Sequence, residues 1–347
     1  MNSPRILFVP DAGREIGGGH VMRCLTLAQA LRDGGATAAF MASPPTAEIL
    51  DLFAGPEIER IAASDAEPAR LAEEAARAAD RFDACVFDSF RLGADGHRAI
   101  ARGRPSLVID NLADRALACD LLMEPDPGRD PRDYDGLVPE TARLLLGPDY
   151  ALVRPAFVAQ REAALQRRSA RGPVQRVLVS MGLTDVGAIS ARVVDRMLPR
   201  LGDASIDVVL GPNTASEARL KTLAARDPRL RLHIAVEDMA SLMAQADLCV
   251  GAGGASIWER CTLGLPAVLV VLANNQAAVG DWLAGHGAVE RVDARAPDFE
   301  AAFDRAFTGL MRSPDRVARL SAESAKLCDG TGADRVAEAF LEIIGRR

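Results

Sequence analysis

The sequence lacks an excess of basic residues, paired cysteines and a long apolar run. Its 347 residues carry a formal net charge of −7. Proteins that bind DNA or RNA usually present a basic face, so the acidic balance argues against a nucleic-acid partner. An acidic chain can still bind a phosphorylated small molecule, because glycine loops and helix N-termini contact phosphate through backbone N–H groups.

The six cysteines form no CxxC pair, so we expect buried thiols in a reducing cytoplasm. No apolar run approaches the roughly 18–20 residues that span a bilayer, and no signal-peptide pattern is visible. The four histidines lie far apart and form no HExxH-type motif. We therefore expect a cytoplasmic monomer with no membrane span, no metal and no cofactor.

Short apolar runs alternate with longer amphipathic stretches along the whole chain. Runs of this kind, apolar along their full length, predict strands at 5–10, 37–42, 85–90, 106–111, 121–124, 176–182, 206–211, 230–236, 248–253 and 267–273. Fully apolar strands separated by helices indicate parallel sheets that are covered on both faces. The fold class is therefore α/β, with two doubly wound Rossmann-like domains.

We place the domain boundary where polar and basic residues precede a proline and a new strand. This gives an N-terminal domain over 1–160, a linker over 161–175, and a C-terminal domain with a terminal helix over 176–347. Ligands of open parallel sheets lie beyond the carboxyl ends of the strands. The two sheets are thus predicted to face one central cleft.

The first stretch with chemical interest is "RILFVPDAGREIGGGH", in which a strand, a glycine loop and a helix start follow one another. It matches neither the dinucleotide fingerprint GxGxxG nor a Walker loop. A helix N-terminus disfavours the imidazolium form, so His20 could act as a general base. Alternatively, His20 only caps or packs the helix.

The second stretch, "RVLVSMGLTDVGAIS" (176–190), again runs from a strand into a helix start. Its glycine and hydroxyl group could contact a phosphate. The alternative is an ordinary turn in which Thr184 or Asp185 caps the helix.

The third stretch is the most specific. "GAGGAS" follows a strand and starts a helix, and Glu259 lies one turn into that helix. A carboxylate in this place commonly accepts hydrogen bonds from ribose hydroxyls. The next strand ends in Asn274, Asn275 and Gln276, at the carboxyl end where ligands bind. Asp88 and Asp110 also end strands and could face the ligand or cap a turn, whereas the other histidines, His97, His233 and His286, are expected to be structural or solvated.

These motifs together resemble a known family. "GGGHVMRCLTLA", "VIDNLADR", "DYALVRPAF", "SMGLTD" and "GAGGASIWERCTLGLPAVLVVLANNQ" are similar to segments of the nucleotide-sugar hydrolases of pseudaminic acid biosynthesis. Those enzymes cleave UDP-2,4-diacetamido-2,4,6-trideoxy-β-L-altropyranose and are related to GT-B glycosyltransferases of the MurG type. The resemblance implies a GT-B arrangement, with UDP held mainly by the second domain.

The resemblance also assigns roles to residues. His20 matches the family's histidine base, and Glu259 matches the carboxylate that binds the ribose diol. The contacts to UDP are assigned to Gly182, Thr184, Val236, Met239, Gly254, Ala255, Ser256 and Glu259. The contacts to the sugar and phosphates are assigned to Arg14, Gly18, Gly19, Asp88, Asn275 and Gln276.

The sequence departs from the family pattern at several positions. Phe90 stands where relatives often have an aromatic hydroxyl, Asn111 where they tend to have a second aspartate, and Leu183 in a segment that usually reads GG[ST]D. "MEPDPG" (123–128) replaces a segment richer in amides. These changes concern the sugar contacts more than the UDP contacts.

The expected reaction is hydrolysis at the anomeric carbon with inversion, in which His20 takes a proton from the attacking water. The product would enter nonulosonic acid biosynthesis and, through it, a glycan such as that on flagellin. Two alternatives remain open: a GT-B glycosyltransferase that uses a UDP-acetamido sugar, and a UDP-sugar binding protein without catalysis.

Overall fold

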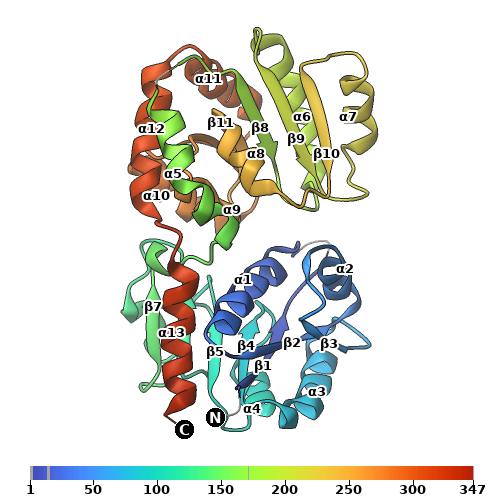
Figure 1. Ribbon diagram of the computed structural model, residues 1–347, viewed down its shortest axis with the longest axis vertical. Coiled ribbons are helices and arrows are strands. Elements are labelled where there is room, and N and C mark those ends of the chain that lie inside the picture. Colours follow the sequence, from blue (N-terminus) through green and yellow to red (C-terminus); the bar gives the residue numbers. More distant parts are fainter. Residues whose placement is uncertain (1–2, 14–15, 171, 347) are drawn as a thin grey trace. The chain divides into compact units, whose positions relative to one another are not determined.

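The computed structural model describes residues 3–13, 16–170 and 172–346. It divides into two compact units, unit 1 with residues 1–153 and 331–347, and unit 2 with residues 154–330. Each unit is a parallel sheet with helices on both faces (Figure 1). Among the described residues, no helix combines the length and apolar character needed to cross a membrane.

Unit 1 contains a seven-stranded parallel sheet in the order β3-β2-β1-β4-β5-β6-β7. Its strands are β1 (Arg5–Pro10), β2 (Thr37–Ala42), β3 (Glu59–Ala62), β4 (Ala84–Asp88), β5 (Ser106–Ile109), β6 (Leu121–Glu124) and β7 (Arg143–Leu146). Its helices are α1 (Gly19–Asp33), α2 (Pro44–Phe53), α3 (Pro68–Ala78), α4 (Ala94–Ala101) and α13 (Gly332–Gly345).

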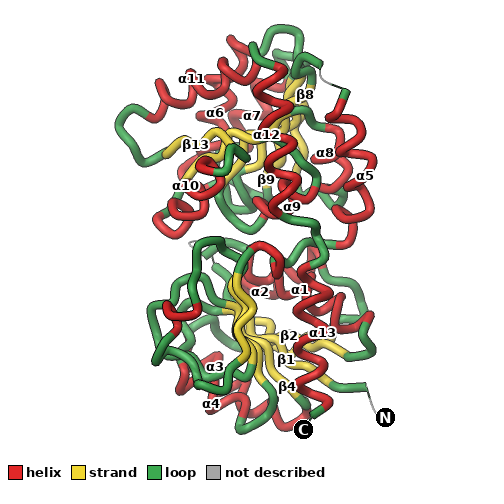
Figure 2. The backbone as a smooth tube through the Cα atoms, turned by 90° about the vertical axis from the view of Figure 1, so that its left-hand side faces the viewer, coloured by secondary structure: helices red, strands yellow, loops and turns green. Residues whose placement is uncertain are grey.

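Both faces of this sheet are apolar because side chains alternate along each strand. Ile6 and Phe8 of β1 belong to the core that α1 and α13 cover, whereas Leu7 and Val9 belong to the core under α3 and α4. Figure 2 shows the strands between these two helix layers. The continuous apolar run of β1 is therefore the signature of a central strand that is buried on both sides.

Unit 2 contains a six-stranded parallel sheet in the order β10-β9-β8-β11-β12-β13. Its strands are β8 (Arg176–Ser180), β9 (Ser205–Leu210), β10 (Leu230–Ile234), β11 (Leu248–Ala252), β12 (Ala267–Val271) and β13 (Val289–Asp293). Its helices are α5 (Pro155–Ser169), α6 (Ile189–Met197), α7 (Glu217–Ala224), α8 (Met239–Gln245), α9 (Ser256–Thr262), α10 (Ala277–Gly285), α11 (Phe299–Met311) and α12 (Pro314–Leu327).

The boundaries differ from those expected from the sequence. Residues 155–169 form α5, which includes most of the expected linker 161–175. The basic residues that suggested a linker have a structural role: Arg161 donates to the carbonyl oxygens of Ala325 and Cys328 (2.8 and 3.0 Å), and Arg168 donates to that of Met243 (2.6 Å). Such bonds satisfy carbonyl groups that helix ends leave without an intrahelical partner.

The terminal helix belongs to unit 1 rather than to the C-terminal domain. Val336 and Phe340 of α13 are fully buried in the same core as Ile6, Phe8 and Leu27. Residues four apart lie on one face of a helix, so this apolar stripe fixes which side of α13 packs. The chain therefore enters unit 2 after residue 153 and returns to unit 1 at residue 331.

Candidate functional site

Both sheets have a point at which the strand order reverses, and the candidate residues follow the strands at that point. In unit 1 the reversal lies between β1 and β4, and in unit 2 it lies between β8 and β11. The loops that leave two such strands run in opposite directions, which opens a crevice at their carboxyl ends. Four of the expected site segments occupy these positions. In unit 1 they are the loop before His20 and the strand end at Asp88; in unit 2 they are the loop with Gly182 and the loop "GAGGAS".

His20 is the second residue of α1, and its side chain is buried. Its Nδ1 lies 2.6 Å from Asp88 Oδ1 and 3.1 Å from the Asp88 carbonyl oxygen. A carboxylate and a carbonyl oxygen can only accept, so Nδ1 carries a proton, and in the neutral ring Nε2 carries the lone pair. The edge-on ring of Phe90, 4.5 Å away between centroids, packs against the imidazole. The ring is thus held with Nε2 ready to accept a proton.

Arg23 holds the other side of the same carboxylate. Its Nε and Nη2 donate to Asp88 Oδ2 and Oδ1 at 2.5 and 2.6 Å. Burial alone would raise the pKa of Asp88, but the charges and hydrogen bonds of Arg23 and His20 outweigh it and lower that pKa to about 2. Asp88 is therefore ionised at any pH near neutrality. Arg23 lies three residues after His20, on the same face of α1.

Asp88 differs from its expected role as a sugar or phosphate contact. Its side chain has no exposed surface, and both carboxylate oxygens already accept hydrogen bonds from Arg23 or His20. A ligand cannot reach a carboxylate that is enclosed in this way. The structure instead makes Asp88 the group that orients His20.

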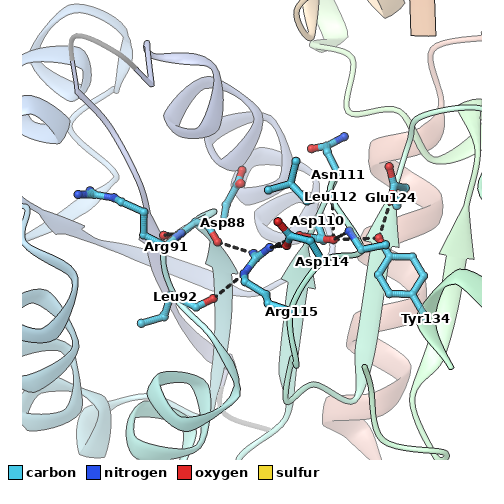
Figure 3. A network of polar contacts seen from close by, with 12 residues as sticks. Asp88, Arg91, Leu92, Asp110, Asn111, Leu112, Asp114, Arg115, Glu124 and Tyr134 are labelled. Carbon is cyan, nitrogen blue, oxygen red and sulfur yellow. Dashed lines mark hydrogen bonds and ion pairs between the residues drawn. The ribbon is translucent and has the colours of Figure 1, made fainter. Parts of the chain in front are cut away.

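Four neighbouring strands of unit 1 each end in a buried carboxylate that is paired with an arginine. Figure 3 shows three of these carboxylates at the ends of β4, β5 and β6. The pairs, in sheet order, are Asp11–Arg91, Asp88–Arg23, Asp110–Arg115 and Glu124–Arg129. Because each negative charge has its own guanidinium, the carboxyl edge of the sheet can hold several buried carboxylates side by side.

Asn111 and Asp126 extend the network that begins at His20. Asn111 Oδ1 accepts from Arg23 Nη1 at 2.6 Å, and Asn111 Nδ2 donates to Asp126 Oδ2 at 2.7 Å. Burial raises the pKa of Asp126. Phe90 and Asn111, two positions at which the sequence departs from the family pattern, therefore both lie in this network. Phe90 packs against His20, and Asn111 accepts a hydrogen bond from Arg23. Sequence reasoning assigned no role to Arg23 or Asp126; the spacing of Arg23 from His20 was the available signal.

Glu124 is a buried carboxyl with incomplete hydrogen bonding. Its Oε1 has no hydrogen-bond partner among the described residues, and burial raises its pKa to about 7. The Tyr134 hydroxyl contacts both Glu124 Oε2 and Asp110 Oδ2, the latter at 3.0 Å. A hydroxyl has one proton to donate. A Glu124 that is protonated on Oε2 and donates to Tyr134, while Tyr134 donates to Asp110, places one proton in each of these two contacts.

We expect this proton to appear in the pH dependence of stability. The pKa of Glu124 is higher in the folded protein, about 7, than its ordinary value of 4.5, so the folded state binds the proton more tightly. The free energy of unfolding should therefore fall as the pH rises from 4.5 to 7, by up to about 1.4 kcal/mol per pH unit from this group. Glu124→Gln should remove this contribution in urea unfolding curves.

The matched control is Glu140→Gln, which neutralises an exposed carboxylate of the same unit. In this variant, the free energy of unfolding should change with pH between 4.5 and 7 as it does in the unmodified protein. An identical slope in Glu124→Gln and in the unmodified protein would show that Glu124 does not take up the proton.

In unit 2, the loop after β8 contains two of the expected UDP contacts. Gly182 has a φ of +94°, a conformation that favours glycine, and both Gly182 and Thr184 are exposed. Asp185 is buried and accepts hydrogen bonds from the backbone N–H groups of Ser190 (2.9 Å) and Ser216 (3.2 Å). Asp185 therefore anchors the turn, as the alternative interpretation held, and leaves Gly182 and Thr184 at the surface.

The loop between β11 and α9 lies against the polar segment after β12. A Cβ atom at Gly253 would lie 2.9 Å from Gln276 Cβ, so the glycine makes room for this side chain. Gln276 Oε1 accepts from the Leu272 backbone N–H at 2.9 Å, which fixes the amide. Gly254, Ala255 and Asn275 are exposed, and Ser256 is half-buried. The structure thus brings 253–256 and 274–276 together.

Glu259 is half-buried, and its Oε1 accepts from Arg154 Nε at 2.8 Å. Arg154 was not among the expected site residues. Val236 is half-buried, and Met239 is buried at the start of α8. Gly18 and Gly19 immediately precede His20, whereas Arg14 lies outside the described residues.

The remaining histidines are not part of these clusters. His97 is buried, stacks on Phe87 and accepts from the Ala118 backbone N–H, and burial lowers its pKa to about 3. His233 contacts Asp207, and His286 contacts the Trp282 carbonyl oxygen. The six cysteines are free and buried, as expected. Within 3–13, 16–170 and 172–346, no group of three His, Cys, Asp or Glu side chains is arranged to hold a metal ion.

The chain is similar to known proteins in part of its sequence and in its fold. The glycosyltransferase family 28 C-terminal domain matches residues 191–285. The crystal structure of MurG from Acinetobacter baumannii superposes with a TM-score of 0.68 at 18% identity, over 98% of this chain and 99% of that one. The fold is GT-B. This fold accounts for the two parallel sheets and for the reversal of strand order in each of them.

The chain is also similar in sequence to two curated proteins. The chain is 24% identical over 285 residues to UDP-2,4-diacetamido-2,4,6-trideoxy-beta-L-altropyranose hydrolase from Campylobacter jejuni subsp. jejuni, which covers 82% of this GT-B chain and 97% of that protein. It is 28% identical over 148 residues to the spore coat polysaccharide biosynthesis protein SpsG from Bacillus subtilis, 42% of each chain. The resemblance to the hydrolase, expected from the motifs, is confirmed.

Proposed function

We propose that the protein is a UDP-sugar hydrolase in which His20 activates water. The observation that carries the proposal is the Arg23–Asp88–His20 chain of hydrogen bonds, which leaves Nε2 as the basic nitrogen. In unit 2, Glu259 and the loop 253–256 are suited to a ribose diol and a diphosphate. The similarity to a hydrolase of a UDP-diacetamido-trideoxyhexose supports a substrate of that class.

In the reaction, His20 Nε2 takes a proton from a water molecule as the water oxygen bonds to the anomeric carbon. The bond from that carbon to the β-phosphate oxygen breaks, and UDP leaves with the electron pair. Attack from the face opposite UDP inverts the configuration. Asp88 stabilises the imidazolium that forms, because its carboxylate stays ionised beside Nδ1.

We expect UDP to be released from UDP-2,4-diacetamido-2,4,6-trideoxyhexoses when no acceptor is added. A time course by NMR identifies the sugar that is cleaved, the release of UDP and the anomer that forms first. The expected first product is the free sugar with inverted configuration. Release of UDP at the rate of the uncatalysed reaction would contradict the proposal.

The match to glycosyltransferase family 28 favours glycosyl transfer as a second candidate. A transferase releases UDP only when a sugar or lipid acceptor is supplied, so the same time course with and without cell-extract acceptors separates the two activities. Calorimetric binding of UDP without turnover of any sugar in the panel would favour a binding protein instead.

A further inference from the structure

Arg260 is a buried cation in α9, next to the loop that we assign to the diphosphate. The residue is 2% exposed, and it is the only arginine or lysine among the described residues that is buried to this degree. Nη2 donates to the Ala252 carbonyl oxygen at 2.8 Å, and Nη1 contacts Ser256 Oγ at 3.2 Å. The guanidinium thus connects Ala252, at the start of the loop, with Ser256, at its end.

The hydrogen-bond partners of this cation carry no negative charge. Among the described residues, no carboxylate forms an ion pair with Arg260. Its partners are a carbonyl oxygen and a hydroxyl group, and burial raises the pKa of the neighbouring Cys249 thiol. The contrast with unit 1 is clear, because Arg23 there is bound to the ionised Asp88. A buried charge without a counter-charge is unfavourable, so proteins seldom keep one.

The backbone makes room for the guanidinium. A Cβ atom at Gly251 would lie 2.6 Å from Arg260 Nη1 and 3.2 Å from Cys249 Sγ. Glycine at this position of a central strand therefore lets the cation lie beneath the loop. On the loop itself, a Cβ atom at Gly254 would meet no protein atom within 4 Å, so the space beside Gly254 is open.

We propose that Arg260 is the counter-charge for the diphosphate of UDP. It does not touch the ligand; it acts through Ser256 and the Ala252 carbonyl group, which makes it a positioning residue with a long-range electrostatic effect. The bound diphosphate offsets the unpaired guanidinium, and the guanidinium stabilises the negative charge that the leaving UDP gains when the glycosidic bond breaks. This inference rests on the proposed function, because it takes a UDP-sugar as the substrate.

The proposal predicts an effect that grows with the charge of the ligand. Arg260→Met should weaken the binding of UDP by about 10- to 30-fold, the size expected for charges roughly 8–10 Å apart at an effective dielectric constant near 20. The effect on UMP should be smaller. The affinity for uridine should stay within about twofold, because a neutral nucleoside has no net charge for the guanidinium to attract.

Two further variants separate the effect of the Arg260 charge from a general loss of nucleotide binding. Arg260→Lys keeps the charge and should retain most of the preference for UDP over uridine. Glu259→Gln, which alters the assigned ribose contact, should weaken uridine, UMP and UDP by a similar factor. Competition binding followed by NMR covers all three ligands, and circular dichroism confirms the fold of each variant.

The outcomes are distinguishable. If Arg260→Met weakens uridine and UDP equally, Arg260 only shapes the loop and the proposal is overturned, while the proposed function stands. The same holds if UDP affinity does not change. If Arg260→Met does not fold, the Lys variant decides: loss of the preference for UDP despite the retained charge also overturns the proposal. If the unmodified protein does not bind UDP, the proposed function fails and the inference with it.

Discussion

Replacing His20 by asparagine lowers the rate of UDP-sugar hydrolysis by about 10²–10⁴-fold, the contribution typical of a general base. Asparagine places its side-chain N–H group near the position of Nδ1, so the hydrogen bond to Asp88 can persist. What is lost is Nε2, the atom that accepts the proton from water. The measurement is kcat from the initial rate of UDP release at saturating substrate.

Binding of UDP to the His20→Asn variant should be unchanged, because the residues assigned to UDP belong to unit 2. The matched control is His97→Gln, which replaces the other buried histidine of unit 1. That variant can lose stability, since His97 stacks on Phe87, but folded protein should keep its turnover. Equal losses of activity in the two variants would remove His20 from the mechanism.

The Asp88→Asn variant should lose about 10³–10⁴-fold in kcat, by analogy with the loss of the orienting aspartate in a Ser-His-Asp triad. In the native protein both carboxylate oxygens accept hydrogen bonds, from Arg23 and from His20. An amide has only one oxygen, so its NH₂ group must face one of these donors. If it faces His20, the proton moves to Nε2 and the base is lost.

The substitution also leaves Arg23 without a full negative partner, so a loss of stability of about 3–5 kcal/mol is expected. Rates should therefore be expressed per folded molecule. Asp110→Asn is the matched control, because Asp110 ends the neighbouring strand and pairs with Arg115 but does not contact His20. Asp110→Asn should lose stability with a much smaller loss of kcat. A folded Asp88→Asn variant with kcat within tenfold of the unmodified protein would contradict the orienting role.

The sequence predicted all the central strands of both sheets and one edge strand, β10 (Leu230–Ile234). β1 and β4 are covered on both faces, so their apolar runs are unbroken. The strands that were not predicted, β3, β7 and β13, lie at sheet edges. β3 reads ERIA and is mostly exposed, and β13 reads VERVD. A strand with one neighbour needs no continuous apolar run, so a search for such runs misses these three edge strands.

The candidate site was predictable to the extent that it is local in the chain. The strand, glycine loop and helix start around His20 are contiguous in the sequence, and the structure has the strand and the helix where they were expected. The partners of His20 are not contiguous: Asp88 is 68 residues away, and Asn111 and Asp126 contribute from two further loops. Their grouping depends on the strand order, which places β4 next to β1.

The role of arginine was the least predictable feature. Arg161 and Arg168 looked like residues of a solvated linker, yet they bind carbonyl oxygens at helix ends. Arg23 and Arg260 are both largely buried, but their partners differ. Arg23 pairs with a carboxylate, whereas Arg260 donates to a carbonyl oxygen. The sequence shows only that each of these residues is an arginine. Their different roles become visible only from the groups that they contact in the folded protein.

The return of the chain to unit 1 has a consequence for the order in which the protein is made. Unit 2 is one uninterrupted segment, so its polypeptide is complete while α13 is still to be synthesised. Unit 1 cannot close its core until Val336 and Phe340 of α13 arrive. On the ribosome, the half of the molecule that we assign to the nucleotide can therefore fold before the half that carries His20. A chain that stops before residue 331 would lose the packing of α13 against the core of α1, the helix that carries His20.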